Sequence, residues 1–141
     1  RKGWLSLLAQ SPAADVARYW VALDMTPQHI VLRSPEIGGV MVRGRAGAVG
    51  AAFNLGEMTV TRASIKLADG TVGHGYVQGR SKNQALQAAC IDALMQTGAA
   101  DKVAAGLLAP LRAAMTTRKT ERAARAAATK VDFFTMVRGE D

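Results

Sequence analysis

The chain has 141 residues, of which 49% are hydrophobic and 21% are charged, a composition typical of one globular domain and not of a disordered segment. No stretch approaches the ~20 apolar residues that cross a bilayer, and the basic start precedes too short an apolar run for a signal peptide. Cys90 is the only cysteine, which excludes internal disulfides and multi-cysteine metal centres. We therefore expect a cytoplasmic protein with one domain over residues 1–141 and no membrane association.

The net charge of +7 is concentrated near the end of the chain. Residues 112–130 hold six cations against one acid, Glu121, a net +5. Such a segment suits nucleic acid, an anionic substrate or an acidic protein surface. Because it is rich in alanine and has no interleaved aromatic residues, a solvated helical face is the leading interpretation.

The first third of the chain predicts two helices. Residues 4–8 are mostly apolar and suggest one or two turns. Ser11 and Pro12 are typical of a helix start, with serine at the cap and proline at the first helical position. An apolar face then repeats at helical spacing in Val16, Tyr19, Trp20 and Leu23.

The middle of the chain predicts four extended runs, over residues 29–33, 39–45, 57–67 and 71–78. Ser34-Pro35-Glu36 is read as a turn between the first two. Within residues 57–67 the apolar face changes side near Arg62, which predicts a bulge or bend there. Asp69-Gly70 is a strong hairpin signal. Short connections between these runs favour antiparallel pairing.

Helical periodicity returns at Ser81 and continues to about Gly98, with further helices over residues 101–108 and 111–129 separated or restarted by Pro110. The predicted fold class is therefore α+β, with N-terminal helices, an antiparallel sheet of about four strands, C-terminal helices and an extended apolar tail. We expect the last helix and tail, residues 111–141, to pack on a partner subunit.

Residue patterns that carry catalysis are absent from the sequence. His29 and His74 have no ligand spacing, and strand histidines with ordinary hydrogen bonds are the simpler interpretation. No serine, histidine and aspartate follow a triad order. Cys90 lies on an apolar helical stripe, where a buried, inert thiol is expected. We predict no catalytic residue and no metal site in this chain.

Cationic residues near glycines are the better candidates for binding. Arg43 and Arg45 flank a glycine-rich loop whose amides could hold phosphate, although the loop lacks the ending of a P-loop. Arg80 and Lys82 flank Ser81, a predicted helix cap, and helix N-termini attract anions. With Arg62, these five residues are the predicted substrate-binding set; for each, a solvated surface charge is an equally simple alternative.

The C-terminal run is apolar and aromatic where chain ends are usually polar. Large apolar side chains left in water are costly and adhesive, so the tail must fold onto its own core or insert into a partner. We predict a partner interface made by five residues: Phe133, Phe134, Met136, Val137 and Arg138.

Several segments together resemble the G subunit family of the bacterial carbon–phosphorus lyase core complex (PhnG). They are Trp4 with Ser6 and Leu8, Phe53-Asn54-Leu55-Gly56-Glu57-Met58-Thr59-Val60-Thr61-Arg62-Ala63, Asp69-Gly70-Thr71-Val72-Gly73, Gly79-Arg80 with Lys82, Ile91-Asp92-Ala93-Leu94-Met95-Gln96, and Val131-Asp132-Phe133-Phe134-Thr135-Met136-Val137-Arg138-Gly139. The family often has aspartate and histidine where this chain has Ser81 and Gln84.

The resemblance implies a phosphonate-degrading complex of G, H, I and J subunits, helped by an L subunit, in which an alkylphosphonate displaces adenine from ATP to give α-D-ribose 1-phosphonate 5-triphosphate. It assigns MgATP to the complex as co-substrate and nucleosidase chemistry to the I subunit. An accessory subunit of this transferase is the leading hypothesis, with no cofactor bound by this chain alone. The alternative is an independent basic nucleic-acid-binding module.

Overall fold

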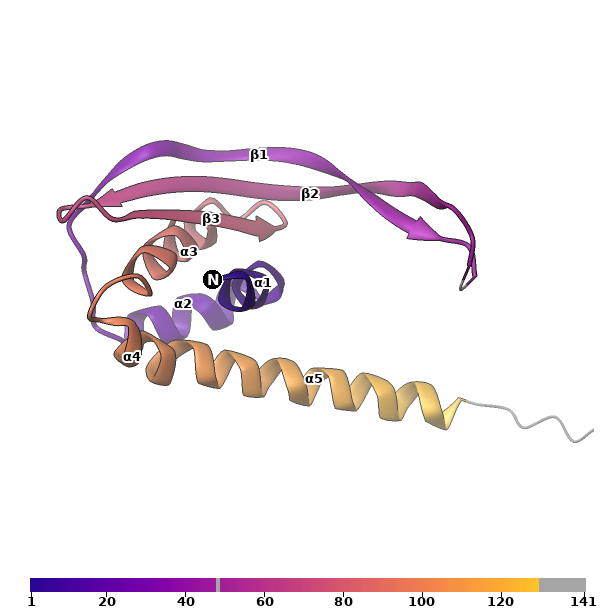
Figure 1. Cartoon of the computed structure of the whole chain (residues 1–141). Coiled ribbons are helices and arrows are strands. Elements are labelled where there is room, and N and C mark those ends of the chain that lie inside the picture. The colour runs from indigo at the N-terminus through magenta and orange to yellow at the C-terminus, as the bar shows by residue number, and fades with distance from the viewer. Residues whose placement is uncertain (48, 130–141) are drawn as a thin grey trace, which may run out of the picture.

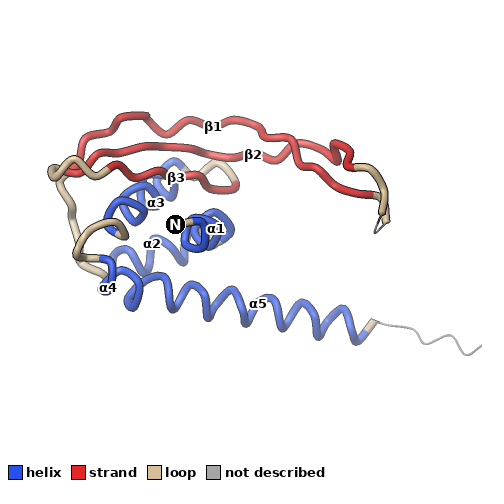
Figure 2. Tube along the Cα trace, in the orientation of Figure 1, coloured by secondary structure: helices blue, strands red, loops and turns tan. Residues whose placement is uncertain are grey.

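A computed structural model describes residues 1–47 and 49–129, and within them a three-stranded antiparallel sheet is covered on one face by helices (Figures 1 and 2). The strands are β1 (His29–Arg45), β2 (Ala52–Leu67) and β3 (Val72–Gln78), in the order β1-β2-β3. The helices are α1 (Lys2–Gln10), α2 (Ala13–Ala22), α3 (Lys82–Leu94), α4 (Ala100–Val103), the π-helical turn η1 (Ala104–Leu108) and α5 (Ala109–Ala128). The predicted α+β class is confirmed.

The predicted count of about four strands is wrong for the described residues, because the first two extended runs form one strand. Ser34 and Pro35 lie inside β1, within the register shift between Arg33 and Glu36. Proline has no backbone N–H to donate, and a bulge in an edge strand accommodates it because no hydrogen bond inside the sheet is lost there. The apparent turn signal therefore marks a bulge.

The predicted hairpin at Asp69-Gly70 is confirmed. Gly70 adopts φ +90°, the left-handed conformation that glycine tolerates. The Leu67 amide donates to the Thr71 carbonyl at 2.9 Å, and Asp69 Oδ1 accepts from the Thr71 amide at 2.9 Å. These local bonds fix the register between β2 and β3.

The expected bulge near Arg62 is not in β2, which pairs regularly with β3 from Val60 to Lys66. The irregularity lies across the ladder, in β1 between Arg33 and Glu36, and Glu36 is opposite Arg62. The change of apolar face along β2 is nevertheless real. Ala63 and Ile65 are buried beneath the helices, whereas Met58 lies on the opposite face, farther along the strand.

Small residues bring α3 into direct contact with β3. A Cβ placed on Gly73 or Gly75 would lie 2.0 Å from the Ala89 carbonyl oxygen or 1.9 Å from that of Ala85. Ala85 and Ala89 are themselves fully buried. The backbones therefore approach more closely than any larger side chain would allow.

The other helices complete the core beneath the sheet. Ser81 caps α3 as predicted, its Oγ accepting from the Gln84 amide at 3.2 Å. Ser11 does not cap α2; its hydroxyl donates to the Leu7 carbonyl at 2.7 Å, and Pro12 stands at the helix start. Gln84 is buried and donates to the carbonyls of Leu8 and Ser11, which joins α3 to the α1–α2 corner.

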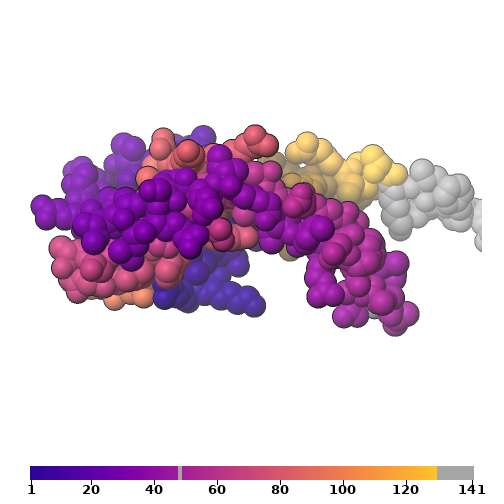
Figure 3. All heavy atoms as spheres, turned by 90° about the horizontal axis from the view of Figure 1, so that it is seen from above, coloured from indigo at the N-terminus to yellow at the C-terminus, as the bar shows by residue number. Residues whose placement is uncertain are grey.

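Two segments project from the same side of the body (Figures 1 and 3). The first is a two-stranded ribbon, residues 38–45 of β1 with 52–59 of β2, which extends beyond the end of β3 and is called the arm below. The second is the C-terminal half of α5, whose residues from Lys119 to Ala128 are all exposed. Among the described helices, none is long and apolar enough to traverse a bilayer.

Candidate functional site

The predicted cationic residues fall into three places. Arg62 lies on the outer face of the sheet, away from the helices. Arg80 and Lys82 lie at the junction of β3 and α3. Arg43 and Arg45 lie on the arm, and Arg43 is seven residues beyond Glu36, the residue opposite Arg62, roughly 23 Å at the ordinary rise of a strand. The five residues therefore do not converge on one pocket.

The strongest electrostatic feature of the outer face is a carboxylate held between two arginines. Glu36 accepts from Arg33 Nη1 at 3.1 Å and from Arg62 Nε at 3.2 Å. The hydrogen bond and the charge of Arg62, with a smaller contribution from Arg33, lower the pKa of Glu36 below its ordinary value. All three side chains are about half exposed, so an anionic group arriving from solvent competes with Glu36 for the same guanidinium donors.

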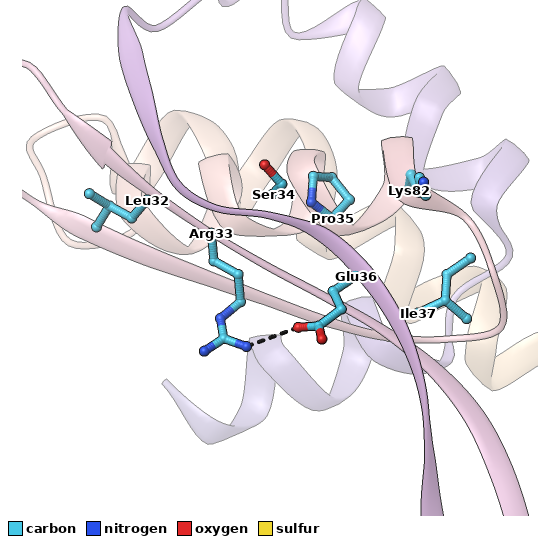
Figure 4. Close-up of a pocket in the computed structure, with 7 residues that line it drawn as sticks. All are labelled: Leu32, Arg33, Ser34, Pro35, Glu36, Ile37 and Lys82. Carbon is cyan, nitrogen blue, oxygen red and sulfur yellow. Dashed lines mark hydrogen bonds and ion pairs between the residues drawn. The ribbon is translucent and has the colours of Figure 1, made fainter.

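A shallow, open depression adjoins this trio (Figure 4). Its lining residues come from the bulged part of β1 and from the start of α3: Leu32, Arg33, Ser34, Pro35, Glu36, Ile37 and Lys82. The structure therefore places Lys82 in the lining of this depression and bonds Arg62, which is not a lining residue, to Glu36. It adds Arg33, which no sequence signal had distinguished from other surface arginines.

The junction that carries Arg80 and Lys82 is rigidly bonded. Gly79 adopts φ +90°, its amide donates to the Thr59 carbonyl at 2.9 Å, and its carbonyl accepts from Thr61 Oγ1 at 2.7 Å. Lys82 then opens α3 beside the Ser81 cap. Both cations are exposed at the positive end of a 13-residue helix, an arrangement that favours anions.

Asp92 is the main ionisable group that sequence reasoning missed. Its side chain is fully buried and accepts from Arg1 through Nε and Nη2, from Trp4 Nε1 at 3.0 Å and from the His74 amide at 2.9 Å. Burial acts to raise the pKa of Asp92, but the bonds from Arg1, His74 and Trp4 outweigh burial and hold it below its ordinary value. The sequence did hold one signal for this buried group, which is that Asp92 is a single acid inside an apolar helical stripe.

The cysteine and the two histidines considered in the sequence analysis occupy ordinary positions in the fold. Cys90 is buried as predicted, and burial raises the pKa of its thiol to about 11, which makes it a poor nucleophile. His29 and His74 both lie on strands, His74 within 2.9 Å of Ser64 Oγ. Across residues 1–47 and 49–129, no three His, Cys, Asp or Glu side chains gather as metal ligands.

The basic segment is helical as predicted and is partly paired with the body. Arg118 Nη1 donates to Asp15 Oδ2 on α2 at 2.9 Å. Arg122 and Lys119 line a groove beside Gln10 and Met115. The predicted interface of Phe133, Phe134, Met136, Val137 and Arg138 lies outside the described residues and stays a prediction.

Comparison with known proteins gives a match over nearly the whole chain. The family described as phosphonate metabolism protein PhnG matches residues 1–139. The alpha-D-ribose 1-methylphosphonate 5-triphosphate synthase subunit PhnG of Rhizobium meliloti (strain 1021) is 43% identical over 141 residues, which is 100% of this chain and 90% of that relative.

Proposed function

The chain belongs to the PhnG family of phosphonate metabolism proteins, and on that premise we propose that it is a subunit of an alpha-D-ribose 1-methylphosphonate 5-triphosphate synthase. The observation that carries this function is the 43% identity to the synthase subunit over the full length of the chain. Similarity of that extent includes both the strands and the helices, so it is not limited to one shared motif.

We propose further that the complex displaces adenine from ATP with an alkylphosphonate and that MgATP is its co-substrate. The partners of the chain are then the H, I and J subunits of the carbon–phosphorus lyase core complex, with the L subunit as an accessory, in the cytoplasm. These details follow from the family resemblance of the sequence segments given above.

The contribution of this chain is accessory, with the reacting groups supplied by its partners. Two facts support this role. Three of the described acids, Asp15, Glu36 and Asp92, are engaged in ion pairs within the fold. The thiol of Cys90 is buried. The cationic residues remain as groups that attract an anionic substrate or bind acidic partner residues.

Co-purification tests the assembly directly. The tagged chain, produced in phosphate-starved cells, is expected to bring down the other synthase subunits in fixed ratio, because a subunit with unpaired apolar surface is stable in its assembly. Mass spectrometry of the eluate identifies the partners. Recovery of the chain alone would contradict the proposed function.

The charge of the β3–α3 junction is expected to serve turnover. Replacing Arg80 and Lys82 together with glutamine should reduce phosphonate-dependent adenine release by the reconstituted complex about tenfold, since each of the two cations near an anion contributes about 0.7 kcal/mol. The matched control is Arg112→Gln, an exposed cation of α5. Unchanged turnover removes the substrate role, and lost assembly transfers these residues to an interface.

Nucleic-acid binding by the basic segment is the competing hypothesis and has its own measurement. Titration of the isolated chain with duplex DNA over a salt series should show only weak binding. Submicromolar binding with a steep salt slope would favour the nucleic-acid-binding module. Pairing of Arg118 with Asp15 reduces the charge that α5 offers to phosphates.

A further inference from the structure

The two faces of the arm differ in chemistry. The ladder pairs Val40 with Met58 and Val42 with Gly56, so these residues share one face with Val60. After the register shift at Val42/Arg43, Phe53 lies opposite Gly44 on this face. Leu55 belongs to it too, because a Cβ on Gly44 would lie 3.7 Å from the Leu55 Cβ. The opposite face carries Met41, Arg43 and Arg45 with Asn54 and Glu57.

The apolar face of the arm is the face that the chain's own helices do not cover. In the body, the helices bury the face of β2 that carries Ala63, Ile65 and Leu67. Along the arm, the apolar residues of β2 lie on the other side. Phe53 is 45% exposed and Leu55 is 66% exposed. Val60, next to Arg62 on this face, is still buried and Met58 is half-buried, so the exposed apolar surface lies farther along the arm, at Phe53 and Leu55.

The arm also leaves its backbone open. β3 pairs with β2 only from Val60 to Lys66, and the Gly79 amide bonds the Thr59 carbonyl. Beyond that bond, within the described chain, the arm is a ribbon of two strands with two free edges. Such a ribbon is at best marginally stable alone in water, and its free edges and apolar face promote association. A surface of this kind is ordinarily covered in the functional assembly.

We propose that the apolar face of the arm docks into an apolar groove of another subunit of the synthase, and that Asp or Glu side chains border this groove along the free β1 edge, where Arg43 and Arg45 reach them from the opposite face. The charge of the arm selects this occupant. Arg43 and Arg45 have no carboxylate within 4.0 Å among the described residues, and Glu57 is the arm's single acid. A second copy would bring four arginines against two acids, on chains that each carry +7, whereas an acidic border neutralises them.

This inference rests on the proposed function, since it needs the other synthase subunits. The test co-expresses them with the tagged full-length chain and compares Phe53→Ser plus Leu55→Ser with Met41→Ser. Met41 is 56% exposed on the opposite face of the same ribbon, so it controls for general damage to the arm. The double variant should weaken assembly about a hundredfold, and the control about threefold at most. Circular dichroism should show the same fold for both.

Five results separate the possibilities. A wild-type chain that brings down no other subunit overturns the proposed function, and this inference with it. Normal assembly by the double variant, or equal loss by the Met41 control, overturns the docking face alone. Wild-type dimers in sedimentation that dissociate in the double variant make a second copy the occupant. If the isolated double variant melts at a clearly lower temperature and loses assembly to a corresponding extent, the apolar face is covered by the chain's own residues and not by a partner.

Discussion

Replacing Gly75 with alanine is expected to destabilise the domain by about 3 kcal/mol, the upper part of the range for overpacked cores. The new Cβ would lie 1.9 Å from the Ala85 carbonyl oxygen and 3.0 Å from the Ala89 amide nitrogen. Both contacts are with helix backbone, so relief requires moving α3 away from the sheet. Urea denaturation followed by circular dichroism measures the change in the free energy of unfolding.

Gly38→Ala is the matched control on the same sheet. A Cβ at Gly38 has no atom within 4 Å, and Gly38 is exposed in an edge strand. Its free energy of unfolding should stay within about 0.5 kcal/mol of the wild type, as for most surface substitutions. Equal stability of the two variants would show that α3 is not held at backbone contact with β3.

The hairpin and the α3 cap could be predicted from the sequence because their signals are local. Asp69-Gly70 needs only a residue tolerant of positive φ and two flanking extended runs, and Ser81 bonds an amide three residues on. In β3, buried and exposed residues alternate strictly, a pattern that requires only that helices cover one face of the sheet. Such features depend on residues that are neighbours in sequence.

The length of β1 could not be predicted, because proline has different meanings at an edge and in a turn. Pro35 ends a strand only if its missing amide would have been bonded in the sheet. That depends on whether a fourth strand pairs with β1, a fact about partners distant in sequence. The apparent break between two short strands became a bulge for this reason.

The candidate site was only partly predictable for the same reason. Arg62 was singled out by the change of apolar face, and the structure explains that change by the limited reach of the helices. Its pairing with Glu36, 26 residues away, depends on the ladder register, which a shift of one residue would alter. Arg33 lies three residues before Glu36 in the same strand, and the bulge between them brings both side chains to one face of the sheet.

Asp92→Asn is expected to cost about 3 kcal/mol, because hydrogen bonds to a buried charge contribute ~1.5–3 kcal/mol each and an unmet donor costs a similar amount. All contacts of the side chain come from donors, so the amide nitrogen of asparagine must face one of them. Arg1 can turn toward water, since its side chain is 43% exposed. Trp4 Nε1 and the His74 amide have less freedom, and α1 and β3 would lose their shared anchor on α3.

The effect of Asp92→Asn on the free energy of unfolding should depend on pH. The pKa of Asp92 in the folded state lies below the ordinary value of 3.8, so the ionised side chain stabilises the fold fully above that value and progressively loses this effect as the pH falls through the folded pKa. The difference between wild type and Asp92→Asn should therefore be largest near neutral pH and shrink below about pH 4. Asp101→Asn, at an exposed site on α4, should leave the melting temperature unchanged at neutral pH. A stability gap between wild type and Asp92→Asn that stays constant from pH 7 down to pH 3 would mean that the carboxylate charge does not hold α1 and β3 to α3.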